Sequence, residues 1–224
     1  LAYAAVPGGW NSTVGRIAII SMLDYTLVDE INFDTLGQGI YDLFYFENKI
    51  MSVNKTPWGG STGWISVTNM LGSHTESHLI NATIGSIVGV KDTMLYTIMN
   101  NGVGSINLNN FSIADTSVVQ PPTLTIANAV MDTLNNLFYV ASTDYFSKGV
   151  GTKYNMLGEE LGTFEAGISP DALAIDYRDN TGISDVNSER KLIIYPNPSS
   201  GTIIIEVNED NSFNKFRIID ISGR

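Results

Sequence analysis

The feature that most constrains the fold of this chain is a repeat of about 43 residues. Its period is marked by apolar residues spaced 44, 43 and 43 positions apart: Leu43, Ile87, Val130 and Leu173. Each of them lies in a short strand-like stretch, and further strand-like stretches follow within the same period. The tetrapeptide Asn-Met-Leu-Gly occurs at 69–72 and again at 155–158, an offset of 86 residues, which is two periods. Internal repetition therefore organises most of the chain.

Four short strands per period, separated by Gly, Asn, Asp and Pro, are typical of a β-propeller blade. No window of the sequence has sustained helical periodicity. The alternative is an all-β sandwich with evenly spaced strands, but a sandwich gives no reason for the same tetrapeptide two periods apart. The sequence therefore predicts an all-β fold in which residues 1–178 form an arc of about four propeller blades.

The order of the strands predicts how the blades are distributed along the chain. With strands labelled A to D outward from the axis, the chain reads B-C-D, then three complete A-B-C-D sets, then a lone A strand over 171–177. Such a last strand is expected to complete the first blade of a ring, because closure removes open sheet edges. We therefore expect a fragment of a larger ring, truncated at both ends; a ring of these four blades alone is the alternative.

Composition excludes several classes of function. The chain has 12 Lys and Arg against 23 Asp and Glu, a net charge of −11, which argues against binding to a nucleic-acid phosphate backbone. It has no Cys, so disulfides, thiolate metal sites and Cys nucleophiles are all excluded. No apolar run approaches the ~18 residues that a membrane-spanning helix needs.

The C-terminal part has a different pattern. Residues 179–189 are polar and are expected to form a linker, and residues 190–224 are expected to form a second, small β domain. Its first strand ends at Pro196, because proline has no N–H to donate to a ladder. A second strand follows over 203–207, and a third is expected over 216–221.

The blade region resembles a known repeat family. The stretch 167–176 (Gly-Ile-Ser-Pro-Asp-Ala-Leu-Ala-Ile-Asp) resembles the surface-layer and YVTN-type propeller repeats of bacterial extracellular proteins. The resemblance covers roughly residues 1–178. It implies a fold rather than an activity, because propellers carry many unrelated functions.

The C-terminal segment resembles the sorting domain of type IX secretion cargo in the Bacteroidetes. The shared elements are a strand, a Tyr-Pro-Asn-Pro turn, a glycine and an Asp-x-x-Gly-Arg turn, carried here by Tyr195, Pro196, Asn197, Pro198, Gly201, Asp220, Gly223 and Arg224. In that family the domain is a small β-sandwich of about twice this length, so only its first strands are expected here. The resemblance implies export by the type IX secretion machinery to the extracellular space or the outer-membrane surface.

The candidate titratable residues predict little chemistry. The two histidines, His74 and His78, would stand about 13 Å apart on a strand, too far apart for one metal ion, so solvated surface histidines are expected. The adjacent Glu159 and Glu160 point to opposite faces of a strand and are expected in a solvated turn.

Three aspartates lie on predicted innermost strands, where some propeller enzymes hold metal ions in their channel: Asp42, Asp132 and Asp176. Carboxylates at strand ends and turns are the alternative interpretation. The sequence contains no Gly-x-Ser-x-Gly elbow, phosphate-binding loop or calcium loop. We therefore assign no catalytic residue, no metal ligand and no cofactor.

Aromatic residues in the predicted B–C loops are the most unusual feature: Trp10, Trp58, Tyr145 and Phe146. The B–C and D–A loops of a propeller emerge on the same face, so these rings are predicted to gather around one mouth. Exposed aromatics among Gly, Ser and Thr suit stacking against sugar rings or a peptide. The alternative is that each ring covers its own blade, and Trp64, at the start of a C strand, is expected in the core.

Two functional hypotheses follow. The first is a secreted or cell-surface propeller that binds a glycan, a peptide or another surface partner through its loop face. The second is a secreted propeller enzyme of the lactonase, lyase or quinone-dependent dehydrogenase type. No histidine lies on a predicted innermost strand, which favours the first. Convergent carboxylates with perturbed pKa values would favour the second.

Overall fold

The computed structural model describes residues 1–8, 14–33, 39–69, 72–177, 192–195 and 204–207. The chain divides into two compact units, Leu1–Ile175 and Asp176–Arg224. Every regular element within the described ranges is a β-strand, which confirms the all-β prediction. Over the same ranges, no helix has the length and apolar character that crossing a bilayer requires.

The first unit contains fifteen strands in four antiparallel sheets, which we call blades 1 to 4. Blade 1 has three strands: β1 (Ala2–Val6), β2 (Arg16–Ile20) and β3 (Leu27–Asn32). Blade 2 has four: β4 (Ile40–Phe46), β5 (Lys49–Asn54), β6 (Gly63–Asn69) and β7 (His74–Ile80). Blade 3 has β8 (Ile84–Lys91), β9 (Met94–Met99), β10 (Gly102–Asn107) and β11 (Ser112–Val119). Blade 4 has β12 (Thr125–Asp132), β13 (Leu137–Thr143), β14 (Lys148–Asn155) and β15 (Glu160–Ile168).

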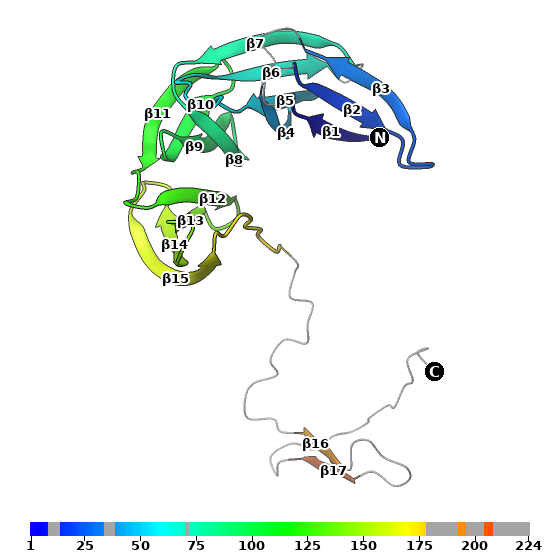
Figure 1. Ribbon diagram of the computed structural model, residues 1–224. Helices are drawn as coiled ribbons and strands as arrows, with labels where there is room; N and C mark the ends of the chain where they lie inside the picture. Colours follow the sequence, from blue (N-terminus) through cyan, green and yellow to red (C-terminus); the bar gives the residue numbers. More distant parts are fainter. Residues whose placement is uncertain (9–13, 34–38, 70–71, 178–191, 196–203, 208–224) are drawn as a thin grey trace. The chain divides into compact units, whose positions relative to one another are not determined.

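The blades follow one another around an arc (Figure 1). Strands β1, β4, β8 and β12 lie on its inner side, and β3, β7, β11 and β15 form its outer rim. Within each blade, consecutive strands pair as an antiparallel meander. This arrangement confirms the predicted β-propeller blades, and blade 1 has the three strands that the B-C-D order predicts.

The predicted lone strand at 171–177 is wrong, because residues 170–177 form no strand. A strand requires a neighbouring strand whose N–H and C=O groups complete the ladder, and none of the described strands pairs with this segment. It is held instead by a side chain, since Asn128 Nδ2 donates to the Asp171 carbonyl at 3.1 Å.

Each inner blade is buried on both faces between its neighbours. On β9, Leu95 and Met99 pack into the core shared with blade 2, whereas Tyr96 and Ile98 pack toward blade 4. Successive side chains of a strand point to opposite faces, so one strand supplies both interfaces. The ring of Tyr96 lies 5.2 Å from that of Phe138 in blade 4, at a tilt of 58°. Burial between consecutive sheets explains why the strands are apolar on both faces.

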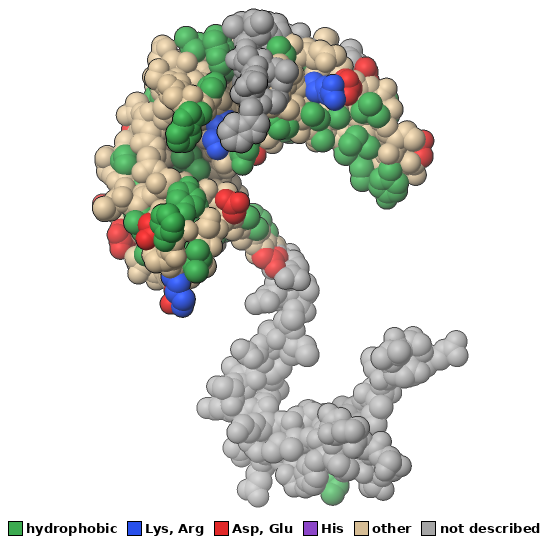
Figure 2. Space-filling model, in the orientation of Figure 1, with side chains coloured by type: hydrophobic (Ala, Val, Ile, Leu, Met, Phe, Trp, Pro, Cys, Tyr) green, Lys and Arg blue, Asp and Glu red, His purple; other side chains and the backbone are tan. Residues whose placement is uncertain are grey.

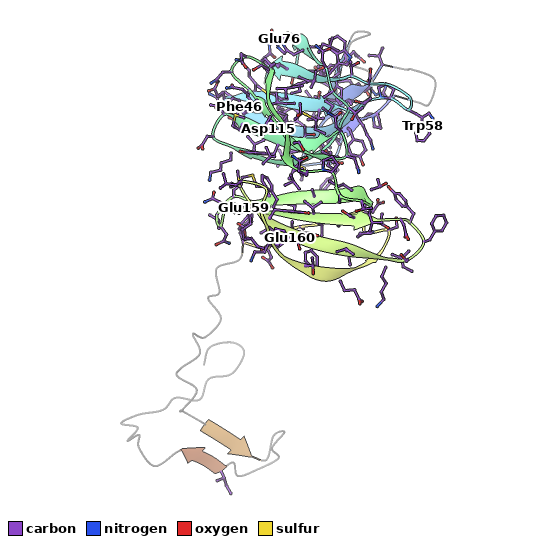
Figure 3. The ribbon with its side chains drawn as sticks, turned by 90° about the vertical axis from the view of Figure 1, so that its left-hand side faces the viewer. Phe46, Trp58, Glu76, Asp115, Glu159 and Glu160 are labelled. Atoms are coloured by element: carbon purple, nitrogen blue, oxygen red, sulfur yellow. The ribbon has the colours of Figure 1, made fainter. Side chains whose placement is uncertain are left out.

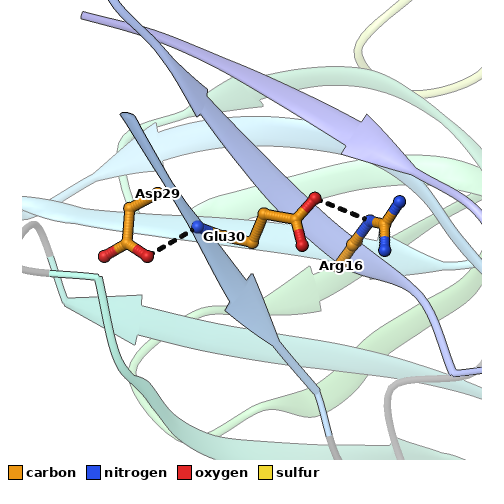
Figure 4. A network of polar contacts seen from close by, with 3 residues as sticks. All are labelled: Arg16, Asp29 and Glu30. Atoms are coloured by element: carbon orange, nitrogen blue, oxygen red, sulfur yellow. Dashed lines mark hydrogen bonds and ion pairs between the residues drawn. The ribbon is translucent and has the colours of Figure 1, made fainter. Parts of the chain in front are cut away.

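Blade 1 shows how polar and apolar faces separate at the end of the arc. Ile17 and Ile31 are buried against blade 2. On the same two strands, Arg16 Nε lies 3.1 Å from Glu30 Oε1, and Asp29 Oδ1 accepts a hydrogen bond from Glu30 N at 2.8 Å (Figure 4). Such a partly exposed ion pair contributes at most about 1 kcal/mol. The isoleucines therefore supply most of the stability of this sheet.

The described ends of the repeated tetrapeptide, Asn69 and Gly72 in blade 2 and Asn155 and Gly158 in blade 4, make matching hydrogen bonds. Asn69 Oδ1 accepts a hydrogen bond from Ser73 N at 3.1 Å, and Asn155 Oδ1 accepts one from Glu159 N at 3.0 Å. The glycine that ends each copy has a positive φ, 91° in blade 2 and 77° in blade 4. Asparagine closes such turns with its side chain, and glycine adopts this φ without steric strain. The repetition in sequence therefore coincides with the same asparagine hydrogen bond and the same glycine conformation in both blades.

The second unit contains one described strand pair, β16 (Leu192–Tyr195) and β17 (Ile204–Val207). The two are antiparallel, with Leu192 opposite Val207 and Tyr195 opposite Ile204. Strand β16 ends directly before Pro196, as the sequence predicts. The predicted linker at 179–189 and third strand at 216–221 lie outside the described residues. So do seven of the predicted sorting residues: Pro196, Asn197, Pro198, Gly201, Asp220, Gly223 and Arg224.

Candidate ligand-binding cavity

A cavity of about 440 Å³ opens at one end of blades 2, 3 and 4. It is lined by residues of the β5–β6, β9–β10 and β13–β14 connections and by the first residues of the innermost strands β8 and β12. Its volume falls within the roughly 300–1,000 Å³ of small-molecule sites. A ligand in this cavity would contact three blades at once.

The cavity arises because the connection of blade 3 is shorter than those on either side. The β5–β6 connection has eight residues (55–62) and the β13–β14 connection has four (144–147), but β9 and β10 are joined by Asn100 and Asn101 alone. Both asparagines have positive φ, 49° and 62°, as a two-residue hairpin turn requires. The short connection of blade 3 (Asn100 and Asn101) therefore forms the floor of the cavity. The longer connections of blade 2 (55–62) and blade 4 (144–147) form its first and second walls.

Trp58 stands on the first wall with its side chain fully exposed (103%). Figure 3 shows it on the opposite side of the blades from Phe46 and Glu159. Its loop is anchored by Thr56, whose N–H donates to the Ile84 carbonyl at 3.0 Å and whose Oγ1 accepts from Ile84 N at 2.9 Å. The exposed Trp58 indole is therefore carried by a loop that is hydrogen-bonded to blade 3.

Tyr145 lines the second wall, on a loop organised by Asp144. Asp144 Oδ1 accepts hydrogen bonds from Ser147 N at 2.7 Å and from Phe146 N at 2.9 Å. Together with the Ser147 hydroxyl, these bonds lower the pKa of Asp144 from 3.8 to about 2. Tyr145 N also donates to Thr143 Oγ1 at 2.8 Å. The loop is therefore closed by local hydrogen bonds, which hold Tyr145 at the cavity.

Side-chain amides form much of the floor. Asn100 Oδ1 accepts from Thr83 N at 3.2 Å and from Thr83 Oγ1 at 3.0 Å. Asn101 Oδ1 accepts from Ile126 N at 3.0 Å, which joins blade 3 to blade 4. Asn128, on the innermost strand of blade 4, also lines the cavity. The floor is a polar network that crosses the blade boundaries.

The charged residues of the lining are one cation and one carboxylate. The Lys55 ammonium lies 4.9 Å from the centroid of the Tyr41 ring, a cation–π contact. Asp171 supplies the carboxylate. The lining is therefore aromatic and amide-rich, with balanced charge.

The structure brings two of the four predicted aromatics to this cavity, Trp58 and Tyr145. Phe146 is 89% exposed on the same loop as Tyr145 but is not part of the lining. Trp10 lies outside the described residues. Trp64 is half-buried rather than in the core, because it lies near the start of β6 opposite Leu79 of the outer strand β7, which is itself exposed.

The expectation that His78 is solvated is wrong. Its ring stacks on Phe111 of blade 3, with centroids 3.7 Å apart and planes 7° from parallel. His78 Nε2 lies 3.3 Å from Glu76 Oε2. The residue is half-buried because the outer strand of blade 2 packs against the β10–β11 connection. The side chain of His74 is outside the described part of the structure.

Three of the predicted acidic residues accept structural hydrogen bonds, and a fourth, Asp176, lies in the segment that forms no strand. Asp42 Oδ2 accepts a hydrogen bond from Ile87 N, and Asp132 Oδ1 accepts from the N–H groups of the turn that follows β12. Hydrogen bonds from Asn135 lower the pKa of Asp132. Glu159 accepts from Asn155 Nδ2 in a turn. Within the described ranges, no group of three or more His, Asp or Glu side chains is placed to hold a metal ion.

Exposed apolar side chains also gather at the β2–β3 connection of blade 1 (Figure 2). Leu23 is 97% exposed and Tyr25 is 78% exposed. This connection lies at the other end of the blades from the β5–β6 connection, since the strands run antiparallel. The apolar turn is therefore separate from the cavity.

The floor residues Asn100, Asn101 and Asn128, and Tyr41 on the rim, were not predicted from the sequence. One signal was available for the floor. The third period contains Asn100-Asn101-Gly102 where the second has an eight-residue loop, and Asn-Gly pairs favour two-residue hairpins. A comparison of loop lengths between periods would have predicted a depression at blade 3.

Comparison with protein families identifies the C-terminal segment. Residues 193–224 match the family described as a secretion system C-terminal sorting domain. The match includes all eight residues of the sorting motif and supports a type IX sorting signal. Such a domain implies a secreted or cell-surface protein and interaction with the secretion machinery. None of the curated proteins is significantly similar to this sequence.

Comparison with one solved structure, the first of the three below, supports the fold of the first unit. The AfRom2 CNH domain superposes with a TM-score of 0.52 at 13% identity, over 75% of this chain and 56% of that one. Dihydro-heme d1 dehydrogenase NirN in complex with DHE gives 0.45 at 15% identity, over 69% of this chain and 34% of that one. The WD40 domain of SCAP from fission yeast gives 0.38 at 13% identity, over 86% and 54%. At these identities the likeness concerns the fold alone.

Proposed function

We propose that this chain is an exported β-propeller protein that binds a glycan or a peptide in the cavity over blade 3. The aromatic rim of the cavity is the observation that carries the proposal. Trp58 is fully exposed on an anchored loop, and Tyr145 lines the opposite wall. Exposed aromatic rings beside a cavity are typical of binding sites, because they supply contact area at little entropic cost.

The exposure of Trp58 is large enough to matter energetically. Full burial of a tryptophan side chain removes about 200 Å² from water, worth about 5 kcal/mol at about 25 cal/mol/Å². A ligand that covers one face of the indole would recover about 2 kcal/mol, which is about thirty-fold in Kd. Trp58 alone can therefore account for a substantial part of a specific affinity.

The lining supports binding more than the enzymatic alternative. Hydrolysis by a lactonase and elimination by a lyase both use convergent acid–base or metal-binding groups. The described lining of the cavity holds a single carboxylate, Asp171, and no histidine, so it offers no pair of acidic or imidazole groups. Aromatic rings and amides instead suit reversible recognition.

Export is the second half of the proposal. The sorting domain supports passage through the type IX machinery of a member of the Bacteroidetes. The repeat pattern supports a surface-layer and YVTN-type propeller. In this proposal the propeller acts outside the cell, where glycans and peptides of the surface are available as ligands.

A binding array tests the proposal. The purified 224-residue chain is applied to immobilised glycans and peptides, together with Trp58→Ala, Tyr145→Ala and Phe146→Ala variants. We expect Trp58→Ala to weaken binding about thirty-fold and Phe146→Ala to change it less than twofold, because Phe146 is exposed without lining the cavity. Equal binding by the Trp58→Ala variant and the wild type would contradict the proposal.

A further inference from the structure

We infer that the ligand is a neutral glycan, whose hydroxyl groups are recognised by Asn100 and Asn128 while one sugar ring packs on Trp58. This inference rests on the proposed function, and it selects between the two ligand classes that the proposed function allows. It is based on the side-chain amide groups that line the cavity and have no hydrogen-bond partner within the described residues.

The orientation of both amides is fixed by their partners. Thr83 N can only donate, so the atom of Asn100 that it reaches at 3.2 Å is Oδ1. The Asp171 carbonyl can only accept, so the atom of Asn128 that lies 3.1 Å from it is Nδ2. Neither assignment depends on a choice between equivalent amide rotamers.

The other polar atom of each amide can then bind a ligand. The Asn100 Nδ2 group, with two N–H donors, has no partner within the part of the chain that the structure describes, and the same holds for Asn128 Oδ1 as an acceptor. Asn100 is exposed and Asn128 is half-buried, and both line the cavity. The floor therefore offers a donor on blade 3 and an acceptor on blade 4.

A donor and an acceptor that line the same cavity match the hydroxyl groups of a sugar, because each hydroxyl both donates and accepts. The C–H bonds on the face of a pyranose ring also suit the negative face of the Trp58 indole. A peptide would instead require open apolar pockets for its side chains. Two of the three isoleucines of the lining, Ile84 and Ile126, are only 3% and 6% exposed and open no such pocket.

The charges of the site favour a neutral glycan over an acidic glycan. The lining has one cation, Lys55, which already faces the ring of Tyr41, and one carboxylate, Asp171. The whole chain carries a net charge of −11, which repels polyanions. A polyuronate would have to overcome this repulsion with a single lysine.

The test compares three ligand classes on the full 224-residue chain. The probes are neutral gluco-, manno-, galacto- and xylohexaoses, an oligogalacturonate, and a library of random heptapeptides. We expect binding of a neutral hexaose, weakened about thirty-fold by Trp58→Ala and about tenfold by Asn128→Ala. We also expect its affinity to change less than twofold between low and high salt, since a neutral ligand releases no counterions.

Two controls keep the result interpretable. Asn109→Ala removes an exposed asparagine from the β10–β11 connection, at the other end of blade 3, and should bind as the wild type does. Asn100→Ala also removes the bonds to Thr83, so its thermal midpoint is measured beside its affinity. Asn128→Ala gives up only the single bond to the Asp171 carbonyl and is the decisive variant if Asn100→Ala unfolds.

Failure of the inference can be told apart from failure of the proposed function. Trp58-dependent binding confined to peptides or to the oligogalacturonate would overturn the inference and leave the proposed function in place. Neutral-glycan binding that needs Trp58 but neither asparagine would do the same. No binding by any probe, or binding that ignores Trp58→Ala, would overturn both.

Discussion

Asp42 Oδ2 accepts a hydrogen bond from Ile87 N at 2.8 Å, which ties the innermost strand of blade 2 to the innermost strand of blade 3. The two residues are 45 positions apart, close to one period of the repeat. The pairing of β8 with β9 is irregular on both sides of Ile87, and the Asp42 carboxylate accepts the hydrogen bond of the Ile87 N–H there. The inner ends of two blades are therefore joined by a bond as well as by apolar packing.

We expect Asp42→Ala to destabilise the chain by about 2 kcal/mol, because the partly buried Ile87 N–H loses its acceptor. Urea unfolding measures the loss. The matched control is Asp115→Ala on β11, where the carboxylate accepts only from Ser117 N two residues away. An equal loss of unfolding free energy in Asp115→Ala and Asp42→Ala would show that the bond between the blades stabilises the chain no more than a local bond does.

The two copies of the tetrapeptide turn predict unequal responses to the same substitution. Gly72 and Gly158 both have positive φ, but a Cβ on Gly158 would lie 1.8 Å from the Val118 carbonyl oxygen of blade 3, whereas the nearest atoms to a Cβ on Gly72 are 3.6 Å away. We expect Gly72→Ala to cost about 1–2 kcal/mol from backbone strain. Gly158→Ala should cost about 2–5 kcal/mol, since Val118 must also move. Similar thermal midpoints for the two variants would contradict this account.

The Asp144 loop predicts a pH response at the cavity wall. Its pKa in the folded chain, about 2, lies below the ordinary value of 3.8, so its contribution is fully present above about pH 4 and is lost as the pH falls toward 2. We expect the Ser147 amide resonance to titrate with a midpoint near pH 2, and to lose this titration in Asp144→Asn. A midpoint near 3.8 would show that the loop is not closed by Asp144.

Export depends on residues 190–224 in this account. When both are expressed behind a signal peptide in a host with a working type IX pathway, the full chain is expected outside the cell, whereas a chain ending at residue 189 is expected to stay in the periplasm. Trp58→Ala serves as the control, because it alters the cavity and leaves the sorting segment intact. Fractionation followed by immunoblotting measures the distribution. Release of the shortened chain at the level of the full one would contradict the role of the segment.

Much of the fold could be predicted from the sequence, because propeller blades repeat their local chemistry. The spacing of Leu43, Ile87 and Val130 marks three inner strands that the structure contains, and the Asn-Met-Leu-Gly copies mark equivalent turns. Strand positions follow from apolar periodicity and turn residues, which are local properties. The segment at 171–177 was mispredicted because its partner strand, rather than its own composition, decides whether it joins a ladder.

The candidate site was only partly predictable. Trp58 and Tyr145 could be predicted as binding residues, because aromatic residues are unexpected in Gly- and Ser-rich loops. Asn100 and Asn128 did not, because asparagines in turns and at strand ends are ordinary in sequence. Their importance comes from tertiary placement, since one amide contacts Thr83 and the other contacts Asp171 on separate segments. The stacking of His78 on Phe111 was equally invisible, because it depends on how two blades pack.

The most direct measurement is the fluorescence of Trp58 during a ligand titration. Trp10→Phe and Trp64→Phe leave Trp58 as the only tryptophan of the chain. With a neutral hexaose that binds, we predict that the emission of Trp58 shifts to shorter wavelength and that acrylamide quenches it less, with the same Kd as the binding assay. Binding without any change in the emission or quenching of Trp58 would contradict the account, since the ligand would then lie elsewhere on the molecule.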